Sequence, residues 1–376
     1  MRNVPQQIFS WLWVIDRYML KEFVINLTAI TGVLWLIYIS TRFARYLAEA
    51  AVGNMPADVI FSLLGFSSLG ALSILLPIAA FLGVMLTLGR MSSDNELTVM
   101  AACGISRKRI IRNVLIFSGV VAGIVAYLSL TIVPSVLAER YELEQKAKMS
   151  ANTTGLVAGS FKESRNGDWT FYSEKLSSDK QLMENVFIEI HRKNKPLIFR
   201  SDTGHFEVDV DTGDKFLVLN EGYRYEGKAG QQDFTIAEFE SHSLLVEKGD
   251  DGQVRERHKA LPTSVLWQRG GLEDIAEIQW RISAAIMTLV LCISAIPLSN
   301  AGPRQGRYAG FVPAVLLYII YSNLLGVNQA WIEKGSISVG VGMVWVHLLM
   351  AMIMLFLMYR QKIQRLLTQQ KRRRQQ

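Results

Sequence analysis

The sequence predicts an α-helical membrane protein with six transmembrane helices, three on each side of an inserted antiparallel β domain. Composition is the first indication, because 50% of the 376 residues are hydrophobic and only 19% are charged, against about 25% charged in soluble domains. The second is the presence of six long stretches without any charged residue. The third is a charged segment of ordinary composition between the third and fourth stretches.

The stretches without Asp, Glu, Lys or Arg are 23–41, 59–89, 113–138, 282–303, 308–332 and 335–359. Each matches or exceeds the roughly 20 residues that a helix needs to cross a bilayer. A soluble enzyme, a disordered protein and a disulfide scaffold are therefore excluded. The two cysteines, Cys103 and Cys292, lie in a charged loop and in an apolar run, so we expect no disulfide framework.

The first two spans have distinct features. Residues 7–22 are amphipathic and predict an interfacial helix that leads into the first span, with Trp11 and Trp13 at headgroup level. Residues 1–21 lack the pattern of a removable signal peptide. The run 59–89 contains Pro77 and many small residues, which favour close packing either within this chain or with a partner helix.

Orientation follows from the basic residues of the short segments, because positive charge is retained in the cytoplasm. Seventeen are assigned to one side: Arg2, Arg17, Lys21, Arg90, Arg107, Lys108, Arg109, Arg112, Arg304, Arg307, Arg360, Lys362, Arg365, Lys371, Arg372, Arg373 and Arg374. Only Arg42, Arg45 and Lys334 lie on the other. Both termini are therefore predicted to be cytoplasmic. A terminal basic cluster of this kind is explained by membrane topology, so we expect no nucleic-acid binding.

The segment between spans three and four predicts mainly strands. A helix is expected over 135–150, followed by period-two patterns in WTFYSEKL, NVFIEIHR, PLIFRSD, GHFEVDVD, KFLVLNEGYRYEG and QDFTIAEFESHSLLV. In NVFIEIHR, Val186, Ile188 and Ile190 share one face. Such strands are typical of a sandwich, jelly roll or partly open barrel. The histidines show no metal-ligand spacing, so the domain is predicted to bind rather than to catalyse.

These features divide the chain into four parts. Residues 1–134 form an N-terminal transmembrane half, and 135–281 form the β domain with its linkers, including a short returning helix within 262–281. Residues 282–359 form the C-terminal transmembrane half, and 360–376 a basic cytoplasmic tail.

The cytoplasmic loop between spans two and three predicts a docking helix at about 94–105. Ser92 or Ser93 is expected to cap it, and Gly104 to end it. Acidic residues in its first turn and an apolar face suit a cleft on a soluble partner. Its predicted contact residues are Asp94, Glu96, Leu97, Val99 and Met100. The chain has no P-loop, so a partner must supply any ATP hydrolysis.

Arg42 and Arg45 form a second predicted site, at the outer end of the first span. They are three residues apart and so share a helix face. Arginine binds phosphate bidentately, which suits a phosphorylated lipid. The alternative is that both side chains snorkel to the interface.

The run LGRMSSDNELTVMAACGIS, the later SNAGPRQGR and the order of three spans, β domain and three spans resemble the lipopolysaccharide-export permease family. The segment PRQGR at 303–307 resembles its F subunit (LptF) more than its G subunit.

The resemblance implies a non-catalytic permease, without a cofactor of its own, in the bacterial inner membrane. It implies that the β domain is a periplasmic jellyroll. The implied partners are the G subunit (LptG), a cytoplasmic ATPase dimer (LptB) and a bitopic C subunit (LptC) with its periplasmic bridge. Lipopolysaccharide extracted from the membrane would be the substrate, with phosphates at Arg42 and Arg45. Glu96 would contact the ATPase.

Two other functions remain open. A permease of the lipoprotein-release or MacB type would act on a lipoprotein or protein, but such chains typically have four spans. An intramembrane enzyme would need ionisable residues within its spans, and His347 is the one titratable side chain of that kind in the six stretches.

Overall fold

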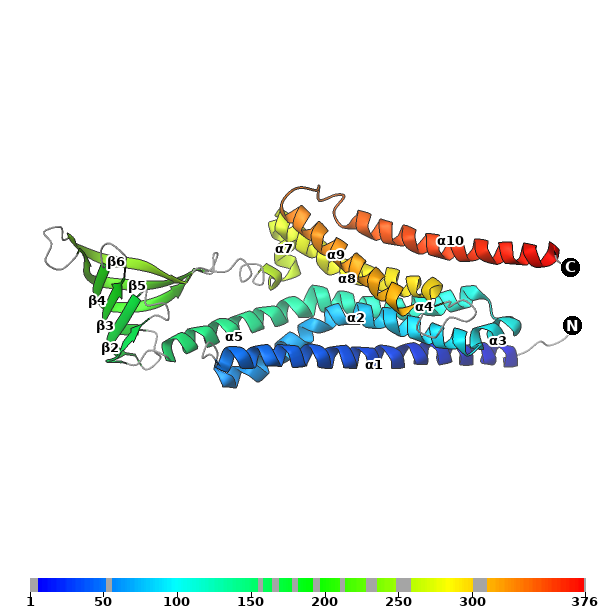
Figure 1. The fold of residues 1–376 in the computed structure, drawn as a ribbon, viewed down its shortest axis with the longest axis horizontal. Coiled ribbons are helices and arrows are strands. Elements are labelled where there is room, and N and C mark those ends of the chain that lie inside the picture. Colours follow the sequence, from blue (N-terminus) through cyan, green and yellow to red (C-terminus); the bar gives the residue numbers. More distant parts are fainter. Residues whose placement is uncertain are drawn as a thin grey trace. The chain divides into compact units, whose positions relative to one another are not determined.

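The computed structural model describes residues 6–51, 56–154, 158–163, 169–177, 182–191, 197–209, 214–227, 235–247, 258–299 and 310–374. The chain forms two compact units (Figure 1). The first comprises residues 1–42, 64–137 and 260–376, and the second comprises 43–63 and 138–259. Residues 303–307, with the PRQGR segment, and the side chains of Trp11 and Trp13 lie outside the described residues.

The helices follow the order that the apolar runs predict. They are α1 (Gln6–Ala51), the 3₁₀ turn η1 (Ala57–Val59), α2 (Ile60–Ser93), α3 (Glu96–Ala102), α4 (Arg107–Tyr127), the π-helical segment η2 (Leu128–Ile132), α5 (Val133–Thr154), α7 (Thr263–Arg269), α8 (Leu272–Leu298), α9 (Phe311–Glu333) and α10 (Val344–Arg374).

Five helical stretches of the described chain are long and apolar enough to cross a membrane: Val14–Ala51, Ala57–Ser93, Arg107–Glu144, Leu272–Leu298 and Phe311–Glu333. The sixth predicted span corresponds to the shorter apolar stretch Val344–Tyr359 at the start of α10. Its helix begins nine residues later than the charge-free run at 335–359, because 335–343 form turns. The predicted fold class of a polytopic helical protein with an inserted β domain is confirmed.

The N-terminal amphipathic stretch is not a separate helix. Residues 7–22 form the beginning of α1, which is continuous from Gln6 to Ala51. Its two acidic residues have partners on neighbouring helices, since Asp16 pairs with Arg109 and Glu22 with Arg90. These ion pairs allow the polar beginning of α1 to pack against α2 and α4.

Close packing within the chain explains Gly83, one of the small residues of α2. A Cβ atom on Gly83 would lie 3.1 Å from the backbone nitrogen of Leu27, so α1 and α2 approach closely there. Nearby, Asn26 donates a hydrogen bond to the hydroxyl of Thr87 at 2.8 Å. A Cβ on Gly65 or Gly70 would meet no atom within 4 Å. The small residues of α2 therefore serve internal packing at Gly83 but not at these two positions.

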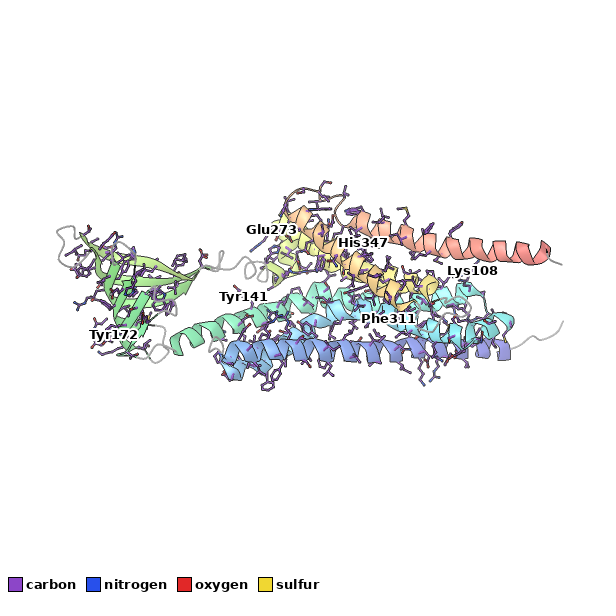
Figure 2. The ribbon with its side chains drawn as sticks, in the orientation of Figure 1. Lys108, Tyr141, Tyr172, Glu273, Phe311 and His347 are labelled. Atoms are coloured by element: carbon purple, nitrogen blue, oxygen red, sulfur yellow. The ribbon has the colours of Figure 1, made fainter. Side chains whose placement is uncertain are left out.

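Helix α8 is central to the first unit and packs against α4, α9 and α10. Its residues Leu291, Cys292 and Ala295 are fully buried in the main apolar core. His347 on α10 (Figure 2) forms hydrogen bonds with the hydroxyls of Tyr321 on α9 and Ser283 on α8. His347 therefore links α8, α9 and α10.

The second unit contains a six-stranded antiparallel sheet in which each strand pairs with the next along the chain. The strands are β1 (Phe161–Glu163), β2 (Trp169–Leu176), β3 (Leu182–Ile190), β4 (Leu197–Val208), β5 (Lys215–Glu226) and β6 (Thr235–Glu247). Two predicted strands, PLIFRSD and GHFEVDVD, are one strand, β4. Gly204 lies inside β4 opposite Leu219, where little room remains for a side chain.

One residue in each of the strands β2 to β6 has no partner in the backbone pairing, and these five residues lie in one row across the sheet. The unpaired row consists of Glu174, Asn185, Asp202, Glu221 and Glu240. Asn185 and Glu221 have left-handed backbone conformations, with φ of 51° and 52°. Beside the row, the hydroxyl of Ser201 donates to the carbonyls of Thr203 and Asn220, and that of Ser173 to Lys175 and Glu184.

This row changes which residues face inward. In β3, Met183 is buried before the row and Val186 and Ile188 after it. In β4, Phe199 before the row and Phe206 after it contribute to the same core. Because side chains alternate with period two, one added residue per strand turns both halves of the sheet toward one apolar core. The prediction that Val186, Ile188 and Ile190 share one face is confirmed, and this face contributes to the core of the sheet.

Gly222 is expected to be required at this bend. A Cβ there would lie 2.2 Å from the carbonyl oxygen of Arg200 and 2.9 Å from Cα of Ser201, so strand β5 would have to move. Gly222→Ala should destabilise the β domain by about 2 kcal/mol through overpacking. Hydrogen exchange of β4 and β5 in the full chain measures this. Replacing the exposed Glu240 of the neighbouring strand with Ala should leave exchange unchanged, and equal protection in both variants would contradict the assignment.

Candidate functional site

The predicted docking helix is shorter than the sequence suggested. Helix α2 continues through Ser93, so neither Ser92 nor Ser93 is a cap. The chain turns at Asp94 and Asn95, and α3 begins at Glu96 with Asn95 as its N-cap at φ 60°. Asparagine is one of the few residues that tolerate this conformation.

The end of α3 follows the prediction. Gly104 has φ 86°, the amide of Gly104 donates to Ala101 and the amide of Ile105 donates to Met100. This is a Schellman motif, which satisfies the last carbonyl groups of the helix. The segment therefore has a defined beginning and end although α3 has only seven residues.

Glu96 lies in a charged network and does not simply face solvent. Its carboxylate is 2.9 Å from a guanidinium nitrogen of Arg90 and accepts a 3.2 Å hydrogen bond from the hydroxyl of Tyr18. Arg90 also contacts Glu22 at 3.0 Å and Asp94 at 3.7 Å. This network joins α1, α2 and α3, so a displacement of α3 would act directly on α1 and α2.

The apolar residues of the segment face two ways. Leu97 and Met100 are half-buried and pack against the core of the first unit. Val99 is 60% exposed, and Ala101, Ala102 and Cys103 are also exposed. Only one of the three large apolar side chains predicted for docking is therefore available on the surface. The exposed face is made mainly of small side chains.

The two arginines of the other predicted site differ in environment. Arg42 is half-buried, its Nε donates to the hydroxyl of Tyr38 at 3.2 Å, and its guanidinium lies 5.5 Å above the Tyr38 ring. Arg45 is exposed. Tyr38 therefore orients Arg42, and the terminal nitrogens of Arg42 form no ion pair with the described residues.

A buried group that sequence reasoning missed lies near the beginning of α8. Arg281 is 2.9 Å from the carboxylate of Glu277, and both side chains are almost fully buried. Arg281 also donates to the hydroxyl of Thr263 at 2.7 Å and to the carbonyl of Leu261 at 3.0 Å. Gln329 of α9 donates to the second oxygen of Glu277 at 3.3 Å. Residues of α7, α8 and α9 and of the segment before α7 thus meet at one ion pair.

The same group compensates for a proline in span three. An α-helix would need the amide of residue 134 to bond the carbonyl of Leu130, but Pro134 has no N–H. The helix adopts π geometry over Leu128–Ile132 at this point. The hydroxyl of Thr263 donates to the Leu130 carbonyl at 2.7 Å. The chain leading to the β domain is thereby bonded to the chain returning from it.

Two signals in the sequence point to this group. Glu277 and Arg281 are four residues apart immediately before the charge-free run 282–303, and Pro134 interrupts the run 113–138. In the sequence alone, Glu277 and Arg281 lie in the linker and Pro134 lies in the third span. The bond through Thr263 depends on residues more than 130 positions apart in the chain, which no local pattern reveals.

The apolar interior of the β domain is the remaining candidate for ligand binding. Phe171, Phe199 and Leu219 are buried in its core. His242 stacks on Phe199 with ring centroids 5.0 Å apart, and burial lowers the pKa of His242 below its usual value. On the edge strand β6, Ile236 and Leu245 are 61% and 53% exposed. The sheet therefore combines an apolar interior with an apolar outer strand.

Arg281→Met is expected to destabilise the helical unit strongly, because it leaves the Glu277 carboxylate buried without its partner. The expected cost is about 3 to 5 kcal/mol. The double variant Arg281→Met with Glu277→Gln should recover part of this loss, since no uncompensated charge remains. Thermal unfolding of the full chain in detergent measures the cycle. If the single and double variants lose the same stability, the charge of Glu277 does not depend on Arg281 for its stabilisation, which would contradict this prediction.

The chain matches the family described as "Lipopolysaccharide export system permease LptF/LptG" over residues 17–360. It is 29% identical over 318 residues to the lipopolysaccharide export system permease protein LptF of Escherichia coli (strain K12), covering 82% of this chain and 84% of that protein. The LptF protein of Shigella flexneri gives the same identity and coverage. These relatives carry the name of the F subunit, which agrees with the resemblance seen at 303–307. The chain belongs to the LptF/LptG family of lipopolysaccharide export system permeases.

Proposed function

We propose that this chain is the F-type transmembrane subunit of an ATP-driven exporter that extracts lipopolysaccharide from the inner membrane. The observation that carries the proposal is the family match over residues 17–360, which includes both helical halves and the whole β domain. The substrate would leave the membrane and enter the periplasmic β domain on its way to the outer membrane. The chain itself would have no catalytic role and no cofactor.

The proposed topology places both termini in the cytoplasm and the β domain in the periplasm. It rests on the charge distribution, because the short segments of one side carry seventeen basic residues and those of the other carry three. In this orientation α3 faces the cytoplasm. Arg42 and Arg45 lie near the periplasmic surface, in the leaflet from which lipopolysaccharide is taken.

A cytoplasmic ATPase dimer (LptB) is the proposed source of energy, and α3 is its proposed contact. The exposed face of Val99, Ala101 and Ala102 suits a shallow apolar cleft. The Arg90, Glu96 and Tyr18 network then transmits movement of α3 to α1 and α2. In this mechanism Glu96 acts through internal bonds as well as through any contact with the ATPase.

Arg42 and Arg45 are the proposed binding groups for lipid phosphate. The half-buried Arg42 is oriented by Tyr38, so less conformational freedom is lost when an anion binds. The exposed Arg45 supplies a second positive charge on the same helix. Phosphate groups on lipopolysaccharide provide the matching ligand.

The β domain is proposed to carry the acyl chains in its apolar interior and to pass them to a neighbouring β domain. Among the described strands, β6 pairs on one side only, with β5. Its exposed apolar residues favour pairing with a further strand. The bitopic C subunit (LptC) and the periplasmic bridge are the proposed neighbours. The paralogous G subunit (LptG) is proposed to pack against α1, which is the least buried of the candidate spans.

Glu96→Lys is expected to leave the chain in the membrane but reduce lipopolysaccharide export at least tenfold. It places a positive charge beside Arg90 and removes the acceptor for Tyr18. Export to the outer membrane is measured in cells that depend on the variant, with co-purified ATPase determined in parallel.

Arg90→Gln is the informative comparison for Glu96→Lys, because it breaks the internal network but keeps the Glu96 carboxylate. If Glu96 contacts the ATPase directly, Arg90→Gln should retain the ATPase. Normal export by Glu96→Lys would refute the coupling role.

The double variant Arg42→Glu and Arg45→Glu is expected to lower photo-crosslinking of lipopolysaccharide to the periplasmic end of α1 by about tenfold. Charge reversal turns phosphate attraction into repulsion. Lys334→Glu is the matched control, since Lys334 is the other basic residue in the short segments of that side and should leave crosslinking unchanged. Unaltered crosslinking in the double variant would favour snorkelling.

A further inference from the structure

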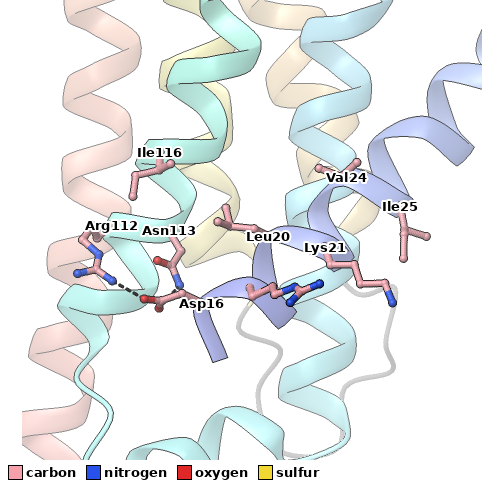
Figure 3. Close-up of a pocket in the computed structure, with 9 residues that line it drawn as sticks. Asp16, Leu20, Lys21, Val24, Ile25, Arg112, Asn113 and Ile116 are labelled. Carbon is pink, nitrogen blue, oxygen red and sulfur yellow. Dashed lines mark hydrogen bonds and ion pairs between the residues drawn. The ribbon is translucent and has the colours of Figure 1, made fainter. Parts of the chain in front are cut away.

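A groove of about 690 Å³ lies between α1 and α4 (Figure 3). Its basic lining residues are Arg17, Lys21 and Arg112. Its apolar wall includes Val24 and Ile25 of α1 and Ile116 of α4. None of these residues belongs to the docking segment, to the Arg42 site or to the β domain.

The acidic residue of the groove is already neutralised. Asp16 accepts two hydrogen bonds from Arg109, at 2.7 and 2.8 Å, and is 2.6 Å from Arg112. The amide of the buried Asn113 donates to Asp16 at 2.8 Å and fixes its orientation. Asp16 therefore serves to hold α1 against α4, and it does not offset the positive charge of the groove.

The remaining cations are available to a ligand. Arg17 and Lys21 are exposed and form no ion pair with any side chain of the described residues. The side chain of Arg112 is 55% exposed and uses one terminal nitrogen for Asp16. Arg17 and Lys21 are four residues apart, so they project from the same side of α1. The groove thus has an excess of positive charge at one end.

The charged and apolar residues of the groove lie where two charge-free runs begin. The charge-free runs begin at residue 23 in α1 and at residue 113 in α4, next to Lys21 and Arg112. Val24, Ile25 and Ile116 lie in the first turns of these runs and are each about half exposed. Basic groups at headgroup level beside apolar groups at acyl-chain level match the two ends of one phospholipid.

We propose that this groove binds an anionic glycerophospholipid of the cytoplasmic leaflet. Arg17, Lys21 and Arg112 contact the headgroup phosphate, and Val24, Ile25 and Ile116 contact the upper part of an acyl chain. The leaflet assignment rests on the topology given under the proposed function. The bound lipid bridges α1 and α4, on the same stretch of α1 that carries Tyr18 and Glu22 of the Glu96 network. Anionic lipid therefore stabilises the helix through which α3 acts.

The test uses the purified full chain with its co-purifying subunits, stripped of lipid and titrated with phosphatidylglycerol or phosphatidylcholine under native mass spectrometry. Wild type should bind phosphatidylglycerol at least tenfold more tightly. Arg17→Gln with Lys21→Gln should remove most of this preference, because two phosphate contacts are lost. The matched control is Lys108→Gln, which removes an exposed positive charge of α4 outside the groove (Figure 2) and should bind like wild type.

A photo-crosslinking amino acid at position 116 identifies the occupant in native membranes. A lipid adduct that disappears in the double variant supports the proposal. A protein adduct would show that the groove is covered by a helix of another subunit and would overturn it. Equal phosphatidylglycerol affinity in wild type and double variant, or no preference over phosphatidylcholine, would also overturn it. These readouts need neither ATP nor lipopolysaccharide, so loss of export alone would leave them unchanged.

Discussion

The helical unit depends on how polar groups are satisfied at the ends of its apolar helices, and Arg281 is the clearest case. A buried guanidinium costs several kcal/mol unless it is paired and fully hydrogen-bonded. Here Glu277, Thr263 and Leu261 supply the acceptors. Their positions are fixed in turn by the proline in span three, because Thr263 also satisfies the carbonyl that Pro134 leaves open. One ion pair thus determines where the returning chain re-enters the helical unit.

A similar arrangement occurs at the other end of the helices. Arg90 and Glu96 form the centre of a network with Tyr18 and Glu22, and Asp16 is held by Arg109 and Arg112. These groups are partly exposed, so each pair contributes less to stability than the buried pair of α8. The main role of these ion pairs is to connect helices. They join α3 to α1 and α2, and they join α1 to α4. A displacement of the short helix α3 would therefore also displace the spans.

The β domain follows a different physical rule. Its strands are continuous in sequence, but one residue in each of five strands does not pair, and all five lie in one row. Since inward and outward positions alternate, a shift of one residue exchanges the two faces. Both halves of the sheet consequently turn apolar side chains toward the same interior. The row itself carries Glu174, Asp202, Glu221 and Glu240, which are exposed.

The sequence by itself determined the class of protein, the order of its elements and the place of the β domain. Charge-free runs and period-two strands are local patterns, so they can be read without knowing what packs against them. It also located α3 and its glycine end, as well as the face of Val186 and Ile188. It did not reveal the internal partners of Glu96, the burial of Leu97 and Met100 or the continuity of β4.

Tertiary structure decided the remaining features, because they depend on residues distant in the chain. The hydroxyl of Thr263 and the carbonyl of Leu130 meet only after spans three and four have packed. The groove at Lys21 and Arg112 exists only where α1 meets α4. The row in the sheet requires five strands in register. Local sequence fixes which groups must be buried or satisfied, and packing decides which partner satisfies them.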